Sequence, residues 1–487
     1  MKVSHRPGLL LVLAAALVHG ALLGSVRMRA GSIDAYAFRS LDSREYYAIA
    51  QNVVEHGAFS QDKPRVGEPL RPDTWRTPGY PLFLAAAMRI VGKSATALVF
   101  VQQVLAVLNV WLAYRIARGA VGERRAVAFA VLFLLEPYHL FYSLWLLATT
   151  WFTTVLLAAW AAWNELASAL RQVDRPEWRL FATGALLGAL CGFLVLVRPV
   201  AVLIPFVVFV GLIIDRVRFR NDDGHIAGNA FLSISAFVLF GLFMTGGWCV
   251  RNALHTGHAA LSDQSGVVLA YFKAAEVELW RRGRAPDRYL ETSLDPTRRD
   301  APHTVWEDVD RKLRERLSDL PPELRERLRW PDLAQGNRTP ADSFRVSAAL
   351  TRVAGGYLLR NPLSTLSCCL VRCGSILTFP LNLAVSPPNG IEVQRLRSTA
   401  MGATYLALVI AALAGPVRGR AAFCVVYFPA ACTLALLLAT TPQVDPRFRV
   451  PMIPLLLFLA LLPRAGTGRR DENGYSASSA SRGASPS

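Results

Sequence analysis

The residues best suited to chemistry lie between Asp42 and Leu84, directly after an apolar segment near the N-terminus. This stretch begins with the sequence Asp-Ser-Arg-Glu-Tyr at positions 42–46. Asp42 or the following serine can cap a helix, and Tyr46 then lies one turn later on the same face. The simplest interpretation is a capped helix beside the membrane. A carboxylate held there could instead act as a base on a membrane-anchored substrate.

A second sequence in this stretch combines arginine with a tight turn. Residues 76–81 read Arg-Thr-Pro-Gly-Tyr-Pro. The two prolines and the glycine favour a turn that presents Arg76 and Tyr80. Arg76 and the nearby Arg71 could pair with a phosphate, because a planar guanidinium matches its oxygens. A structural turn with arginines that reach the interface is the alternative.

Three further arginine motifs lie where apolar segments begin or end. They are Leu196–Pro199 with Arg198, Trp248–Asn252 with Arg251 and Asn252, and Asp445–Pro451 with Arg447 and Arg449. Loop charges place all three on the same external side as Asp42. Retention of basic residues in the cytoplasm does not explain arginines on that side. We therefore expect the four arginine motifs to meet at one face of the protein.

These motifs are expected to be positioned by an all-α polytopic membrane protein. The chain has 487 residues, of which 53% are hydrophobic, and its mean hydropathy is +0.32. Continuous apolar runs of about 17–22 residues recur, which is the length of a membrane-spanning helix. We expect about 10–12 transmembrane helices with external juxtamembrane helices. The segments read roughly as Leu9–Val26, Thr96–Ala117, Ala126–Pro137, Tyr142–Trp163, Leu180–Val197, Val200–Ile214, Ala230–Val250, Ala400–Leu413, Ala421–Thr440 and Val450–Leu462. The pair around Glu136 is either one broken helix or two short ones.

Basic loops set the expected orientation. Lys2 and Arg6 place the N-terminus in the cytoplasm, and clusters of arginine follow alternate segments. This alternation requires that Leu363–Pro380, which has Arg372 in its middle, lies at the outer interface without crossing. The expected location is the inner (plasma) membrane of the cell envelope, with the site on the external or periplasmic face.

Four regions follow from this topology. Residues 1–250 form an N-terminal transmembrane catalytic module that includes an external loop, 27–95. Residues 251–344 are a polar external insert with helical, proline-broken sequence. Residues 345–463 form a C-terminal transmembrane part, and residues 464–487 are a disordered cytoplasmic tail rich in Ser, Gly and Ala.

Charge and cysteine content exclude other classes. The net charge is +18, but no nucleic-acid-binding motif is present, so we expect anionic lipid phosphates and no nucleic acid as partners. The seven cysteines all lie in or beside apolar segments, without zinc-ligand spacing to histidine. They are interpreted as small buried side chains.

Taken in order, the motifs resemble the GT-C superfamily of membrane glycosyltransferases, in the branch of bacterial protein mannosyltransferases and the lipid A aminoarabinose transferase. The resemblance rests on the Asp-x-x-x-Tyr helix, the R-x-P-G-Y-P turn, Leu-x-Arg-Pro, Trp-x-x-Arg-Asn and an Arg-Phe-Arg-x-Pro helix start, where relatives have tyrosine in place of Phe448. It implies hexosyl or pentosyl transfer, with inversion, from a polyprenyl-phosphate sugar to a lipid, glycan or protein acceptor. It also implies Asp42 as the catalytic carboxylate. The implied donor-phosphate ligands are Arg71, Arg76, Arg198, Arg251, Arg447 and Arg449, and the implied substrate-lining residues are Tyr46, Tyr80 and Asn252.

One departure concerns a second carboxylate. Relatives often carry an acid near Thr149, where this chain has Ala-Thr-Thr. We expect Glu136 to supply the missing carboxylate. No cofactor is required by the motifs, but a divalent metal ion between Asp42 and Glu136 stays an alternative. The sugar and the acceptor are not named by the sequence.

Two other classes stay open. A transporter or flippase of lipid-linked sugars would carry charges at mid-membrane and often an internal repeat, and no repeat is found. A catalytically inactive membrane relative is consistent with the missing acid near Thr149.

Overall fold

The computed structural model describes residues 6–170, 176–218, 224–281, 322, 340–382, 420–441, 447 and 449–462. These residues form helices, and their only extended pairing is an isolated bridge between Arg65 and Glu68. The N-terminal half contains α1 (Arg6–Ala30), α2 (Asp34–Ala37), α3 (Leu41–His56), α4 (Gly79–Val91), α5 (Ala95–Val121), α6 (Glu123–Leu134), α7 (Pro137–Tyr142), α8 (Ala148–Ala169) and α9 (Glu177–Val197).

The remaining elements begin with a short 3-10 helix at Pro199–Val202, which follows α9 directly. They continue with α10 (Leu203–Arg218), α11 (Gly224–Thr256), α12 (Gln264–Val267), a π-helical turn at Val268–Ala274, α13 (Ala275–Arg281), α18 (Pro340–Arg360), α19 (Pro362–Asn382), α21 (Arg420–Thr440) and α22 (Arg449–Leu461). The expected segment Ala400–Leu413, most of the polar insert and the C-terminal tail lie outside the described residues.

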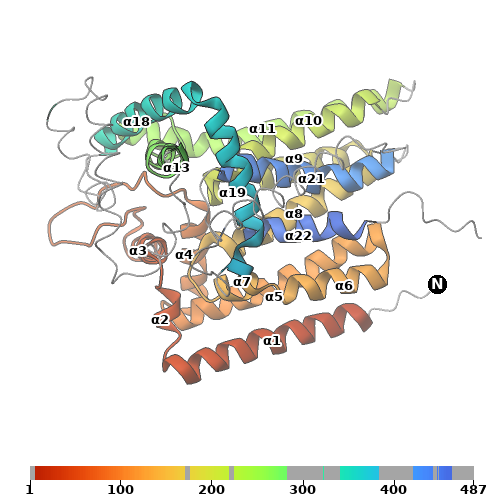
Figure 1. Cartoon of the computed structure of the whole chain (residues 1–487), viewed down its shortest axis with the longest axis horizontal. Helices are drawn as coiled ribbons and strands as arrows, with labels where there is room; N and C mark the ends of the chain where they lie inside the picture. The colour runs from red at the N-terminus through yellow and green to blue at the C-terminus, as the bar shows by residue number, and fades with distance from the viewer. Residues whose placement is uncertain are drawn as a thin grey trace, which may run out of the picture.

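The all-helical membrane architecture is confirmed. Six described helices are long and apolar enough to cross a membrane, and three shorter apolar helices accompany them. The long segments are Arg6–Ala30, Ala95–Val121, Glu177–Val197, Pro199–Val217, Phe231–Thr256 and Phe423–Thr440. The long helices run roughly parallel to one another (Figure 1), and α2, α3, α13 and α18 gather at one end of this bundle.

The predicted boundaries are least accurate around Glu136. The segment expected to begin at Tyr142 begins instead at Ala148, because residues 137–142 form the separate helix α7. Pro137 occupies the first turn of α7, and the Glu136 carboxylate accepts a hydrogen bond from the His139 backbone N at 2.7 Å. A proline there has no N–H to lose, and the carboxylate cap satisfies another free donor, so a new helix starts at this point.

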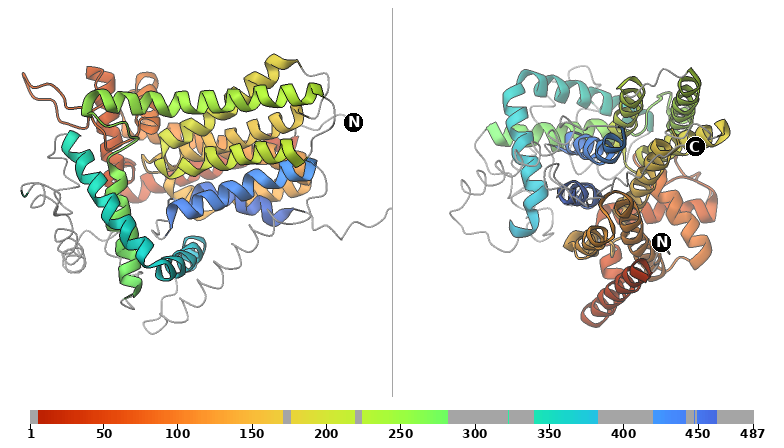
Figure 2. Two further views of the ribbon diagram at one scale, coloured as in Figure 1. Left: turned by 90° about the horizontal axis from the view of Figure 1, so that it is seen from above. Right: turned by 90° about the vertical axis from the view of Figure 1, so that its right-hand side faces the viewer.

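Helix α19 lies across the long axis of the bundle, in contrast to the apolar helices beside it. Figure 1 shows it nearly perpendicular to α21 and α22, and the views in Figure 2 agree. Its charged residue Arg372 is almost fully buried and pairs with Glu276 of α13 at 2.5 Å. A paired, buried arginine avoids the cost of an isolated charge. That this helix lies at the outer interface without crossing the membrane stays a prediction.

Helices α9 and α11 approach each other through glycine. A Cβ built on Gly184 would lie 2.4 Å from the carbonyl oxygen of Ser233, and one built on Gly188 would lie 2.1 Å from that of Phe237. The same holds at Gly192, where the carbonyl oxygen of Gly241 would lie 2.7 Å away. The absence of side chains at this four-residue spacing allows the two backbones to touch, which is how small residues join membrane helices.

This contact predicts a steep cost for a larger residue. Gly188→Leu would force α9 away from α11, and overpacking of this kind costs about 1–3 kcal/mol. We expect a lower midpoint of thermal unfolding for the detergent-solubilised variant. Gly246→Leu is the matched control on α11, because a Cβ at Gly246 meets nothing within 4 Å. Equal midpoints for the two variants would contradict the close contact.

Candidate active site

Asp42 lies in the first turn of α3, and Glu45 follows on the same face. Ser40 precedes the helix in an extended conformation, and Gly57 ends it in the left-handed conformation. A carboxylate in the first turn is stabilised by the free N–H groups there. Residues three apart on a helix are neighbours, so α3 presents Asp42 and Glu45 as a pair.

Two arginines from distant parts of the chain converge on this pair. One oxygen of Asp42 accepts a hydrogen bond from Arg76 Nη2, and the other accepts one from Arg447 Nη1. Glu45 Oε2 contacts the same Arg76, at 2.7 Å from Nε and 2.5 Å from Nη2. The ring of Tyr46 lies 5.0 Å from the Arg76 guanidinium carbon. Two carboxylates and two guanidiniums thus form one neutral cluster, called the acidic-basic cluster below.

The cluster keeps Asp42 ionised. Burial alone would raise the pKa of Asp42, but the charges and hydrogen bonds of Arg76 and Arg447 outweigh it and hold the pKa well below its usual range. For Glu45, burial prevails over Arg76 and raises the pKa. Asp42 is therefore an anion at physiological pH, and it is a weak base as long as both guanidiniums remain.

Arg76 is oriented by the backbone around it. Its own N–H donates to Asp73 Oδ1 at 2.8 Å, and Asp73 also accepts a hydrogen bond from Gln61. Arg251 Nη1 donates to the carbonyl oxygen of Asp73 at 2.6 Å. The Arg251 guanidinium lies against two aromatic rings, 4.6 Å from Trp248 and 5.5 Å from Phe59. The Trp-x-x-Arg motif thus supports the loop that carries Arg76.

Asn252 and the segment after α11 complete this support. Asn252 Nδ2 donates to the carbonyl oxygen of Ala260 at 2.8 Å, which closes the turn that leads to α12. In that turn Ser262 Oγ donates to the carbonyl oxygen of Trp75 at 2.7 Å. Asp263 accepts a hydrogen bond from Thr74 Oγ1 at 3.1 Å. Arg251 therefore contacts the loop 73–77 directly, whereas Asn252 holds the segment 260–263 that contacts the same loop.

Arg198 and Tyr80 lie in the helical layer next to the cluster. Arg198 Nη2 donates to Thr149 Oγ1 at 3.1 Å, at the position where relatives often carry an acid. Tyr80 is fully buried, donates its hydroxyl to Gln102 at 2.6 Å and packs edge-on against Tyr46. Gly79 makes this possible, because its missing Cβ would lie 2.7 Å from the backbone N of Val197. The turn at Gly79 therefore rests directly on the end of α9.

Glu136 forms a second pair. Its Oε1 lies 3.3 Å from Arg449 Nε, and its other oxygen caps α7 through His139. The Arg449 guanidinium carbon also lies 5.7 Å from the centre of the Tyr138 ring. Asp42 and Glu136 therefore neutralise different arginines of one short segment, Arg447 and Arg449. The prediction of a shared ion between the two carboxylates is not matched by this arrangement.

A divalent metal does not fit these carboxylates. Both oxygens of Asp42 face guanidinium groups, and the oxygens of Glu136 face a guanidinium and a backbone N–H. Within the described ranges no group of three or more His, Cys, Asp or Glu side chains could hold a metal. The arrangement suits an anion held by arginines.

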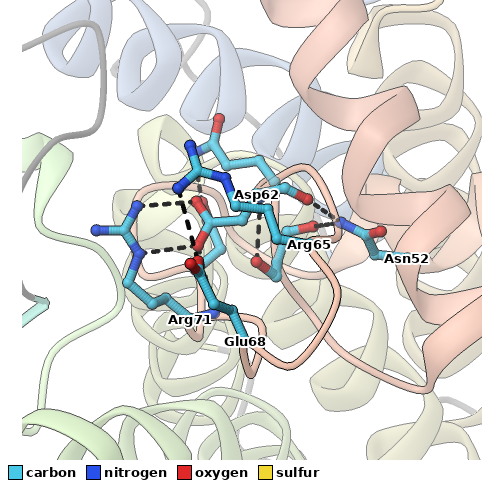
Figure 3. Close-up of polar contacts among 8 residues, drawn as sticks. Asn52, Asp62, Arg65, Glu68 and Arg71 are labelled. Carbon is cyan, nitrogen blue, oxygen red and sulfur yellow. Dashed lines mark hydrogen bonds and ion pairs between the residues drawn. The ribbon is translucent and has the colours of Figure 1, made fainter.

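Arg71 is not brought to the cluster. Its Nε and Nη2 donate to the two oxygens of Asp62 at 2.8 and 3.2 Å, in an exposed loop (Figure 3). Asn52 Nδ2 holds the same loop through the carbonyl oxygen of Asp62 at 2.9 Å. The side chain of Arg71 is 53% exposed, and its ion pair with Asp62 stabilises the surface loop.

Three acidic residues of this region were absent from the sequence-based prediction. Glu45 could have been identified, because it lies three residues after Asp42 in an expected helix. Asp73 also had a local signal, since an aspartate three residues before Arg76 can accept from its backbone N–H. No local sequence signal pointed to Asp263, because its partner Thr74 is distant in sequence.

Comparison with known proteins supports the motif-based resemblance. Residues 75–240 match the family model described as dolichyl-phosphate-mannose-protein mannosyltransferase. The resemblance to GT-C membrane glycosyltransferases is thereby confirmed. No curated protein matches the sequence.

Solved structures of this kind are distant in sequence. ArnT from Cupriavidus metallidurans bound to undecaprenyl phosphate is 14% identical, with 93% of this chain and 78% of that chain covered and a TM-score of 0.38. Its apo form is 16% identical, with 92% and 77% covered and a TM-score of 0.39. The Archaeoglobus fulgidus oligosaccharyltransferase complex with Zn and sulfate is 14% identical, with 93% and 48% covered and a TM-score of 0.48.

The buried Asp263 predicts a pH-dependent stability. Burial, reinforced by the neighbouring charge of Asp73, raises the pKa of Asp263 to about 7. An acid whose pKa is raised by folding stabilises the protein below its unfolded pKa of about 3.9, and this stability is lost as the pH rises through about 7. We expect thermal midpoints measured at pH 5, 6, 7 and 8 to fall more steeply for the wild type than for Asp263→Asn.

The control for this experiment is Asp34→Asn, because Asp34 is exposed at the start of α2. Its pH profile should match that of the wild type. If Asp263→Asn also retained the full decline between pH 5 and 8, the buried carboxyl group would not be its source.

Proposed function

We propose that this protein transfers a sugar from a polyprenyl-phosphate donor to an acceptor hydroxyl at the external face of the plasma membrane, with inversion at the anomeric carbon. One observation carries the proposal: Asp42 of α3 is held between Arg76 and Arg447. Helix α3 lies at one end of the helix bundle (Figure 1). The family model matched by residues 75–240 is described by a dolichyl-phosphate-mannose donor, which is a donor of this class.

The chemistry divides between the cations and the carboxylate. Arg76 and Arg447 bind the phosphate that bridges lipid and sugar, and they stabilise the charge that develops as the bond from the anomeric carbon to the phosphate oxygen breaks. The bonding electron pair leaves with the polyprenyl phosphate. The acceptor oxygen forms the new bond from the opposite face, and Asp42 takes its proton.

The supporting residues are given positioning roles. Asp73, Arg251 and Asn252 keep the loop 73–77 in place, and with it Arg76. Glu136 and Arg449 hold the beginning of α22 next to α7. Arg198 supports the layer beneath Tyr80 through Thr149. The acceptor is a lipid, glycan or protein hydroxyl, or a phosphate.

Removal of the Asp42 charge should abolish transfer without loss of donor binding. Asp42 acts on the acceptor proton in the transition state, so Asp42→Asn should lower kcat by about 10²–10⁴-fold. Arg447→Gln and Arg76→Gln should mainly raise KM for the donor, because the arginines hold the phosphate in ground and transition states alike. The assay follows release of polyprenyl phosphate from hexosyl and pentosyl donors by purified protein in nanodiscs.

Asp62→Asn is the matched control, because Asp62 also pairs with an arginine of the external loop but lies outside the cluster. It should retain full turnover. Near-normal turnover of Asp42→Asn would remove both the assignment of Asp42 and the placement of the chemistry in this loop. Donor binding without turnover by the wild type, across the donors tested, would favour a transporter or an inactive relative.

A further inference from the structure

The pairing of Asp42 raises a conflict within the proposed function. Both of its oxygens face guanidinium groups, yet the reaction needs a carboxylate that can take a proton. The same two arginines are needed by the donor's phosphate. One guanidinium cannot serve the carboxylate and the phosphate equally well, so the arrangement must change when the donor arrives.

Arg76 is firmly held, and it is the less exposed of the two arginines. It contacts Glu45 through both Nε and Nη2, its backbone N–H is bound to Asp73, and its side chain is only 8% exposed. Movement of Arg76 would therefore break contacts with α3 and with the loop 73–77 together. The cost of leaving Glu45 buried without its cation adds to this.

Arg447 is better placed to move. Its side chain is 21% exposed, and the Asp42 side chain that it contacts is 24% exposed, so an anion from solvent or the membrane interface can reach the pair. Two residues later, Arg449 is bound to Glu136, whose side chain is 6% exposed. That second pair holds the beginning of α22 in place, so the Arg447 side chain can rotate without a shift of the helix.

We propose that Arg447 exchanges partners, pairing with Asp42 in the empty site and with the donor's phosphate in the loaded site. Donor binding then frees one oxygen of Asp42 and leaves the carboxylate able to take the acceptor's proton. The proposal rests on the proposed function and adds an order to it: the base becomes active only after the donor is bound. Without donor, the carboxylate stays neutralised.

The exchange has a thermodynamic consequence that a fixed site lacks. Asp42 and the phosphate compete for one guanidinium, so each weakens the other's hold on it by the same factor. Removal of the carboxylate should therefore improve phosphate binding, even though it abolishes turnover. A fixed site, in which Arg447 holds Asp42 and phosphate together, predicts no such gain.

The test measures the affinity of undecaprenyl phosphate for the purified full-length protein in nanodiscs. Compared with the wild type, Arg447→Gln should bind at least about 10-fold more weakly, and Asp42→Asn should bind about 5-fold or more tightly. In the Arg447→Gln background, the addition of Asp42→Asn should bring no gain. This double-mutant cycle assigns the competition to Arg447.

Two controls separate exchange from general electrostatics. Asp62→Asn removes the same unit of charge from the external loop and should leave the affinity unchanged. Glu45→Gln removes a neighbouring charge of the cluster itself, and it should give a smaller gain than Asp42→Asn, because Glu45 pairs with Arg76. Asp42→Ser repeats the measurement with a smaller side chain in case Asp42→Asn does not fold, as judged by size-exclusion behaviour.

The outcomes are distinct. Equal or weaker binding by folded Asp42→Asn and Asp42→Ser overturns the exchange, and so does an equal gain from Glu45→Gln or a gain that persists in the Arg447→Gln background. In those cases wild-type binding and turnover leave the proposed function standing. If the wild type and all variants fail to bind undecaprenyl phosphate, the proposed function fails and the exchange fails with it.

Discussion

The candidate site depends on one guanidinium. Arg76 bridges two carboxylates on α3, and its backbone is bound to Asp73. A buried arginine is stable only when its charge is compensated and its donors are used, and this requirement links α3 to the loop before α4. The same loop is fixed from the other side by Arg251 and Asp263. Segments separated by almost two hundred residues thus act on one side chain.

The arginine motifs divide into two kinds by what they contact. Arg76, Arg447 and Arg449 face carboxylates, so each guanidinium balances a negative charge. Arg198 and Arg251 contact a hydroxyl and a backbone carbonyl, respectively, and their contribution is geometric. A motif that looks uniform in sequence, an arginine at one end of an apolar segment, therefore serves two physical purposes. The difference is visible only when the partner is known.

Much of the fold was predictable because hydrophobic length and loop charge are local properties. The existence of the helix at Asp42 and the turn at Gly79 were likewise predictable from polar and turn residues. The predicted cap was wrong, because Ser40 occupies the N-cap position and Asp42 lies in the first turn. The partners of Asp42, Glu136 and Arg251 were not. Glu136 caps α7 and pairs with Arg449, because the short helix at Pro137 directs its carboxylate there. Contacts between residues hundreds of positions apart, such as Arg447 and Asp42, depend on how the helices pack. The spacing of residues along one sequence does not reveal that packing.

The glycine contact between α9 and α11 has a consequence for how the site responds to its surroundings. Arg198 follows α9 directly, and Arg251 lies near the end of α11. Helices that touch backbone to backbone tilt as one rigid body, so a thinner or thicker bilayer changes their common angle rather than their separation. The distance between Arg198 and Arg251 therefore depends on the glycines at positions 184, 188 and 192, whose lack of a Cβ lets the two helices touch. The relative positions of Arg198 and Arg251 would then stay the same in membranes of different lipid composition.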